Sequence, residues 1–224
     1  EQHRQLVHEA IGTVRLLERI STEIPTYPVD LDAVWVFSGP GTFYSPLKGK
    51  EKTYLAWRDR QRILAGIHVT REITSRAISI ESDSVQSSDT LSMDDIRQYG
   101  PLFVYNGIPV ENEVLKQALT AQEILLPREK VVILETVLDH GISKSNANTL
   151  DQVQGFYQSI VSPESKLYGV EKVGVVSDVT AIPRILFYLE KYNSEHVSRG
   201  HLGLRFWIFA VCDDPKALIL SLLY

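Results

Sequence analysis

Five short apolar runs recur along the chain, and none of them alternates with polar residues. They are rich in β-branched and aromatic residues, and they span residues 33–37, 102–105, 131–134, 173–176 and 206–211. Runs of this length and composition are typical of strands that are buried on both faces of a parallel sheet. The pattern therefore predicts five buried strands.

Between these runs the spacing of the apolar residues changes to that of a helix. Residues 182–189 place four apolar side chains at i, i+3, i+4 and i+7, and residues 114–119 and 150–160 carry similar stripes. Alternation of strands with helices predicts right-handed crossovers and a mostly parallel sheet. We therefore expect an α/β fold, a three-layer α/β/α Rossmann-like arrangement with a sheet of about five strands.

The length of 224 residues suits a single α/β domain over residues 1–224. Residues 1–28 are expected to form an N-terminal amphipathic helix and a linker. Residues 75–100 are expected to form a polar insertion, because the stretch at 82–92 holds five serines and two aspartates. This insertion is either a lid over a site or a plain surface excursion.

Composition and charge exclude several classes of function. A net charge of -5 without a run of Lys or Arg argues against nucleic-acid binding. The single cysteine, Cys212, excludes an intrachain disulfide and a Cys-rich zinc site, and the histidines lack metal-ligand spacing, so we expect no metal centre of that kind. No apolar run approaches the 18 or so residues of a membrane span, and no signal peptide is evident, so a cytoplasmic location is expected. The start at Glu1 rather than Met leaves room for an upstream targeting or anchor segment.

Polar residues and glycines follow most of the predicted strands. Ligands of open parallel sheets bind outside the carboxyl ends of the strands, so we expect these residues to form a site. The candidate ligand-binding residues are Ser38, Gly39, Gly41, Arg62, Asn106, Gly107, Asn148, Thr149, Ser177 and Arg184. The candidate catalytic residues are the acids Glu113 and Asp178, which suit a general base or a Mg²⁺ ligand.

Several of these residues also have a structural interpretation. The Ser-Gly-Pro-Gly stretch at 38–41 is either a tight turn or the wall of a ligand site, since glycine permits both. Asn148 with Asp151 fits a helix cap, and capping alone would explain the pair. Arg184 suits either a surface ion pair or the planar recognition of phosphate or carboxylate.

Taken in order, these motifs resemble the YdcF/SanA/ElyC-like family, a Rossmann-like domain. The resemblance covers residues 32–190 and rests on five stretches, which are VFSGPG (36–41), RQRILAG (60–66), VYNG with a following Glu113 (104–113), NTLDQV (148–153) and VSDVTAIPRI (176–185). The chain departs from the family pattern at three places: Ala181 stands for a His, Gln152 for an Asn, and Asn106-Gly107 for Ser-Gly-Gly.

The resemblance implies a nucleotide-like or other anionic small-molecule ligand, with S-adenosylmethionine or Mg²⁺ as possible cofactors. Binding is expected to survive the change at Ala181 better than catalysis would. Two alternatives stay open, namely a Mg-assisted hydrolase or transferase acting on a phosphorylated or nucleotide substrate, and a non-catalytic interaction module in which the family site has decayed. The oligomeric state cannot be read from the sequence.

Overall fold

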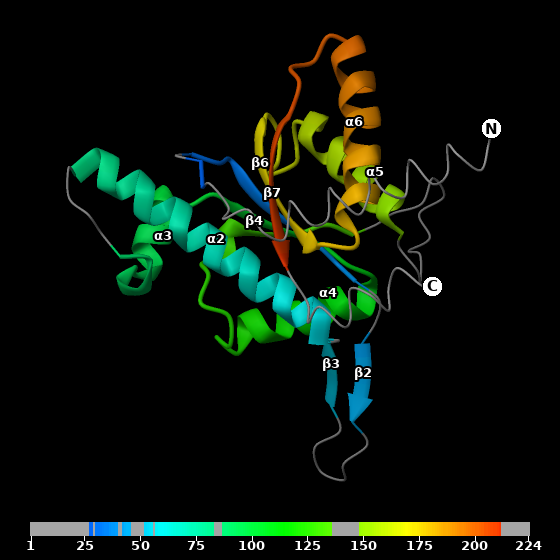
Figure 1. Cartoon of the computed structure of the whole chain (residues 1–224). Coiled ribbons are helices and arrows are strands. Elements are labelled where there is room, and N and C mark those ends of the chain that lie inside the picture. Colours follow the sequence, from blue (N-terminus) through cyan, green and yellow to red (C-terminus); the bar gives the residue numbers. More distant parts are fainter. Residues whose placement is uncertain are drawn as a thin grey trace.

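The computed structural model describes residues 27–28, 30–39, 42–45, 52–55, 57–82, 87–135 and 148–211. All five predicted strands are present and form one parallel sheet (Figure 1). The strands are β1 (Ala33–Phe37), β4 (Leu102–Asn106), β5 (Val131–Ile133), β6 (Lys172–Asp178) and β7 (Arg205–Val211). Their order in the sheet is β5-β4-β1-β6-β7. The α/β fold and its parallel sheet are therefore confirmed.

Helices occupy the connections between the strands, where the apolar spacing predicted them. They are α2 (Trp57–Ser82), α3 (Met93–Tyr99), α4 (Pro109–Thr120), α5 (Thr149–Val161) and α6 (Ile182–Ser198), with short 3-10 turns at Ser88–Thr90 and Arg128–Lys130. Pro at N1 of α4 and at N2 of α6 favours these starts, because the ring fixes φ where no intrahelical N–H bond is required.

Two apolar clusters cover the two faces of the sheet and make the three layers. On one face, α5 and α6 pack against the sheet through side chains such as Phe156 and Ile185, around the fully buried Trp35. On the other face, α2, α3 and α4 contribute side chains such as Ile73 and Leu115. Trp35 and Phe156 stack with their ring centroids 4.0 Å apart, which fixes α5 closely against β1.

The helices change face between β1, the central strand, and its neighbour β6. Counted within the sheet alone, the strand order is 3-2-1-4-5, which is the order of a Rossmann-like sheet. The chain that leaves β1 leads to α2 on one face, whereas β6 leads to α6 on the other. The carboxyl ends of β1 and β6 therefore lie at the topological switch point, where such sheets bind their ligands.

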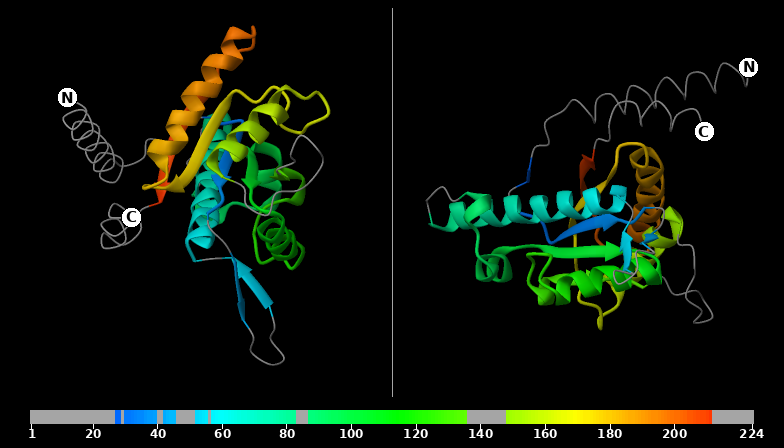
Figure 2. Two further views of the ribbon diagram at one scale, coloured as in Figure 1. Left: turned by 90° about the vertical axis from the view of Figure 1, so that its right-hand side faces the viewer. Right: turned by 90° about the horizontal axis from the view of Figure 1, so that it is seen from below.

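A two-stranded antiparallel sheet, β2 (Thr42–Ser45) with β3 (Lys52–Leu55), was not anticipated by the sequence patterns. It projects from the body of the molecule ahead of α2 (Figure 2). Four-residue strands give too short an alternation to stand out against the surrounding polar residues.

Part of the predicted polar insertion is helical. Residues 75–82 form the last turns of α2, where Ser79 and Ser82 donate their hydroxyls to the carbonyls of Ser75 and Ile78. Bonds of this kind let a serine-rich segment stay helical. The predicted N-terminal helix over 3–20, most of its linker, and Gly41 lie outside the described residues.

Candidate functional site

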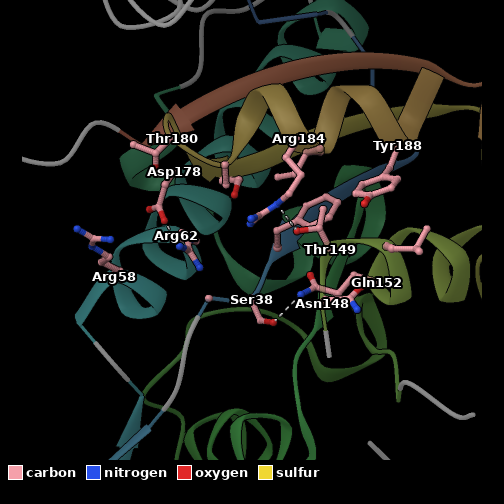
Figure 3. A pocket seen from close by; sticks show the side chains of 16 residues that line it. Ser38, Arg58, Arg62, Asn148, Thr149, Gln152, Asp178, Thr180, Arg184 and Tyr188 are labelled. Carbon is pink, nitrogen blue, oxygen red and sulfur yellow. Dashed lines mark hydrogen bonds and ion pairs between the residues drawn. The ribbon is translucent and has the colours of Figure 1, made fainter. Parts of the chain in front are cut away.

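A cavity of about 700 Å³ opens outside the carboxyl ends of β1 and β6, at the switch point of the sheet (Figure 3). Its walls come from the ends of both strands and from the first turns of α2, α5 and α6. The lining residues are Phe37, Ser38, Gly39, Arg58, Arg62, Asn148, Thr149, Leu150, Gln152, Ser177, Asp178, Thr180, Ala181, Arg184, Ile185 and Tyr188. Eight of the predicted site residues are therefore brought together here.

The turn after β1 forms one wall and passes very close to α2. The N–H of Gly39 donates a 2.5 Å hydrogen bond to the carboxylate of Asp59 in the first turn of α2. A Cβ atom at position 39 would lie 1.9 Å from a guanidinium nitrogen of Arg62. Glycine is needed at this position because no side chain fits between the turn and the buried arginine.

A buried charge cluster supports this wall from below. Arg62 lies between two carboxylates, bonding Asp59 at 3.1 Å and forming an ion pair with Asp178 at the end of β6. The hydroxyl of Tyr105, on β4, donates to the second oxygen of Asp59. Arg62 and Asp59 are 3% and 0% exposed, so this cluster is nearly removed from water.

Burial sets the protonation behaviour of this cluster. It raises the pKa of Asp59, against the opposing effects of the Tyr105 hydroxyl, the Arg62 charge and the Gly39 N–H. Burial, and then the negative charge of Asp59, raise the pKa of Tyr105 well above its usual range. Tyr105 therefore stays a neutral hydrogen-bond donor, and Arg62 is held in place as a fixed cation.

The start of α5 forms the opposite wall. Asn148 accepts the N–H of Asp151 at 3.0 Å, and Asp151 accepts the N–H of Asn148 at 3.1 Å, so the pair forms a capping box. The capping interpretation of this pair is confirmed. The N–H groups of Thr149 and Leu150 have no acceptor within the helix, as is general for a first turn. Both residues line the cavity, where such groups favour an anion.

Arg184 joins the starts of the two helices on this face of the sheet. It lies in the first turn of α6, and its Nε donates a 2.9 Å hydrogen bond to the hydroxyl of Thr149. Within the described part of the chain, no carboxylate forms an ion pair with its guanidinium. Figure 3 shows the guanidinium extending into the cavity, above Ser38. Its terminal N–H groups donate to no side chain or backbone group among the described residues, so they are the donors that a ligand in the cavity would meet.

Two buried oxygen atoms at the cavity wall lack a hydrogen-bond donor among the described residues. They are Oε1 of Gln152 and Oδ1 of Asp178, and each residue is 4% exposed. The amide nitrogen of Gln152 donates to the hydroxyl of Ser38 at 3.1 Å, which links α5 to the turn after β1. Buried acceptors without a donor are costly unless something else supplies one.

Four predicted site residues do not reach the cavity lining or cannot be placed. Asn106 is fully buried and donates to the backbone carbonyl of Gln152, and the N–H of Gly107 donates to the side chain of Asn112. Glu113 is exposed on α4 and accepts from Gln117. Gly41 lies outside the described residues. The two candidate catalytic acids, Glu113 and Asp178, are therefore not gathered at one site.

Sequence reasoning missed three contributors to the site: Asp59, Tyr105 and Tyr188. Asp59 falls on the apolar stripe of α2, three and four residues before Arg62 and Ile63, and this spacing was a signal that it faces the sheet. Tyr188 lies seven residues after Ala181 and so shares its side of α6. The hydrogen bond from Tyr105 to Asp59 joins residues 46 positions apart, so no local sequence pattern predicts it.

The charges that line the cavity favour an anion. Among its described lining residues, three are arginines (Arg58, Arg62 and Arg184) and one, Asp178, is acidic. Within the described ranges, no cluster of three or more His, Cys, Asp or Glu side chains is arranged to hold a metal ion. In the same ranges, no helix is long and apolar enough to cross a membrane.

Comparison of the chain with family models, with curated proteins and with solved structures gave no match in any of the three. The resemblance to the YdcF/SanA/ElyC-like family therefore stays a hypothesis, and the geometry of the cavity is the basis for assigning a function.

Proposed function

We propose that this protein binds an anionic small molecule of the nucleotide-like kind in the cavity at the carboxyl ends of β1 and β6. The observation that carries the proposal is the place of Arg184. Its guanidinium bridges to the first residue of α5 and points into a cavity at the switch point of the sheet. An anion there would meet a planar cation and two helix starts together.

The buried cluster of Arg62, Asp59 and Asp178 shapes the cavity wall, and we do not assign it the main contact with the ligand. Arg62 is held between Asp59 and Asp178, so its charge is partly neutralised by its own partners. Arg184 has no such partner among the described residues. We therefore assign the main anion contact to Arg184 and the shaping of the wall to Arg62, Asp59 and Gly39.

The buried acceptors add a second requirement on the ligand. Asp178 and Gln152, both in the cavity wall, each have a buried oxygen without a donor among the described residues. A ligand that carries hydroxyl groups as well as an anionic group would satisfy them after a small shift of either side chain. Catalysis is not part of the proposal, because Glu113 lies on α4 outside the cavity lining and Asp178 is paired with Arg62.

Calorimetric titration tests the proposal, with inorganic phosphate, AMP and S-adenosylmethionine as probes, each with and without Mg²⁺. At least one of these probes, each of which carries a phosphate or carboxylate group, should bind the wild type, and Arg184→Gln should weaken that binding by about 1.5–3 kcal/mol, the range for hydrogen bonds to a charged group. Arg205→Gln is the matched control, because Arg205 is exposed at the amino end of β7, whereas the cavity lies at the carboxyl ends of the strands.

A bound ligand should also raise the melting temperature. At 100 times its Kd, the expected gain in the free energy of unfolding is about 2.7 kcal/mol. The proposal fails if none of the probes binds the wild type, or if Arg184→Gln binds as tightly as Arg205→Gln does.

A further inference from the structure

The side of α6 that faces the cavity changes in character along its length. Ala181, Arg184, Ile185 and Tyr188 all line the cavity, and their spacing of i, i+3, i+4 and i+7 places them on one face of the helix. Arg184 supplies the charge near the helix start. Ile185, the next residue, and Tyr188, one turn further on, supply an apolar and aromatic surface.

The two ends of the cavity are therefore chemically different. Figure 3 shows Tyr188 at one end, next to Thr149, while Arg58, Asp178 and Thr180 gather at the other end. Leu150, from the start of α5, also lines the cavity. A flat, apolar group would find the ring of Tyr188 at the first end, where polar side chains such as Thr149 and Gln152 also lie, whereas the side chains labelled in Figure 3 at the second end are all polar.

The dimensions agree with a ligand that has both an anionic and a flat part. Residues 184 and 188 are four positions apart, which corresponds to about 6 Å along the helix axis. A pentose is of the size that joins groups separated in this way. A cavity of about 700 Å³ also lies within the usual range for whole small-molecule ligands, far above what a single phosphate fills.

We propose that the cavity binds a nucleoside monophosphate, with its phosphate at Arg184 and the start of α5 and its base against the ring of Tyr188. This inference rests on the proposed function, since it requires that the cavity binds an anion. It makes Tyr188 the residue that distinguishes a nucleotide from a simple sugar phosphate. The pentose, between the phosphate and the base, would then lie nearest to Gln152, whose buried Oε1 has no donor among the described residues (Figure 3).

Titration with a graded set of probes tests the inference: inorganic phosphate, ribose 5-phosphate, adenosine and AMP. Stacking of a base on an aromatic side chain is worth about 1–3 kcal/mol, so AMP should bind about 5- to 150-fold more tightly than ribose 5-phosphate. Tyr188→Ala should remove that preference and leave the affinity for ribose 5-phosphate unchanged. Tyr188→Phe should keep the preference, because the ring is retained.

The adjacent residue on α6 provides a matched control. Phe187 is 64% exposed and does not line the cavity, so Phe187→Ala removes an aromatic ring that contacts Tyr188 edge-on, with centroids 5.4 Å apart, but leaves every lining side chain in place. Tyr188→Leu serves beside Tyr188→Ala, since it removes the flat ring while keeping apolar volume against the core. Thermal melting without ligand checks that each variant is folded.

The possible results separate this inference from the proposed function. If AMP and ribose 5-phosphate bind equally well, or if AMP stays preferred in both Tyr188→Leu and Tyr188→Ala, the placement of the base is wrong while anion binding stands. If none of the phosphate-bearing probes binds, the proposed function fails and the inference fails with it.

Discussion

The carboxyl ends of β1 and β4 are neighbours in the sheet, and each carries a small polar motif, yet only one opens into the cavity. After β1, Ser38 and Gly39 line the cavity beside Asp178 of β6. After β4, Asn106 and Gly107 direct their polar groups into the protein, to Gln152 and Asn112. The same kinds of residue thus serve a candidate site at one strand end and internal structure at the other.

The topology of the sheet explains the difference. α2 and α4, which follow β1 and β4, both pack on one face, so the end of β4 is closed by its own helix start. There Glu111 caps the N–H of Ile108 at 3.0 Å. Beside β1, in contrast, β6 sends its helix to the other face, and the divergence of the two connections leaves the crevice open. Polar residues at a strand end indicate a ligand site mainly where neighbouring connections diverge.

The largest effect on stability is expected from replacing Arg62, the buried cation that pairs with both Asp59 and Asp178. Arg62→Met leaves the carboxylates of Asp59 and Asp178 buried without their cation, and breaking a buried ion pair from one side costs about 3–5 kcal/mol of stability. Urea denaturation followed by circular dichroism measures it. Arg60→Met, at an exposed position on the same helix, should change stability by no more than about 0.5 kcal/mol. Equal stability of the two variants would show that Arg62 is not structural.

A smaller effect on stability is expected when the polar side chain at the end of β1 or of β4 is replaced by alanine. Asn106→Ala leaves the buried carbonyl of Gln152 without its side-chain donor, which should cost about 1–3 kcal/mol of stability without acting on the ligand directly. Ser38→Ala should weaken anion binding, because the hydroxyl lines the cavity, and should cost less stability than Asn106→Ala, because the bond that it accepts from Gln152 is only partly buried. Denaturation and titration of both variants measure this contrast. The reverse pattern would contradict the assignment of the two ends.

The smallest effect concerns the pH dependence of stability. Because burial raises the pKa of Asp59, the folded protein keeps a proton that the unfolded chain releases above about pH 4, so this residue makes stability fall as pH rises towards the raised pKa. Relative to Asp59→Asn, the wild type should lose at most about 1.4 kcal/mol per pH unit in this range, since one proton is involved. Denaturation at a series of pH values from 4 to 7 measures the difference.

A capping aspartate gives a control of opposite sign for this pH dependence. Bonds from the backbone and hydroxyl of Ser92 lower the pKa of Asp95, so stability from that residue is present above about pH 4 and is lost as pH falls through the lowered value. The comparison of wild type with Asp95→Asn should therefore slope the other way, below pH 4. A flat difference between wild type and Asp59→Asn would show that Asp59 titrates alike in the folded and unfolded states.

The sequence predicted the sheet well because burial on both faces leaves a direct trace in the apolar runs. The first run coincides with β1, and the others match their strands to within two residues. The start of α5 could also be predicted, since Asn148 and Asp151 have the spacing of a capping box. For α4 the sequence indicated Glu113 as the candidate catalytic acid, whereas Pro109 at the first position makes Glu111 the capping acid and Glu113 is exposed.

Only part of the site could be predicted from the sequence, because its residues meet through tertiary packing. The carboxyl-end rule gathered Ser38, Asn148, Ser177 and Arg184 correctly, but it cannot tell an open strand end from a closed one before the faces of the helices are known. Arg62 was expected to bind the ligand directly, whereas the structure places it between two carboxylates. The partners that hold it come from distant segments and leave no local spacing.

A crystal structure of the protein with AMP would locate the ligand itself. We expect phosphate density within hydrogen-bonding distance of the Arg184 guanidinium and the N–H groups of Thr149 and Leu150, outside the ends of β1 and β6. Density for the ligand beside Asn106 and Gly107, or a cavity that stays empty at saturating AMP, would contradict this expectation.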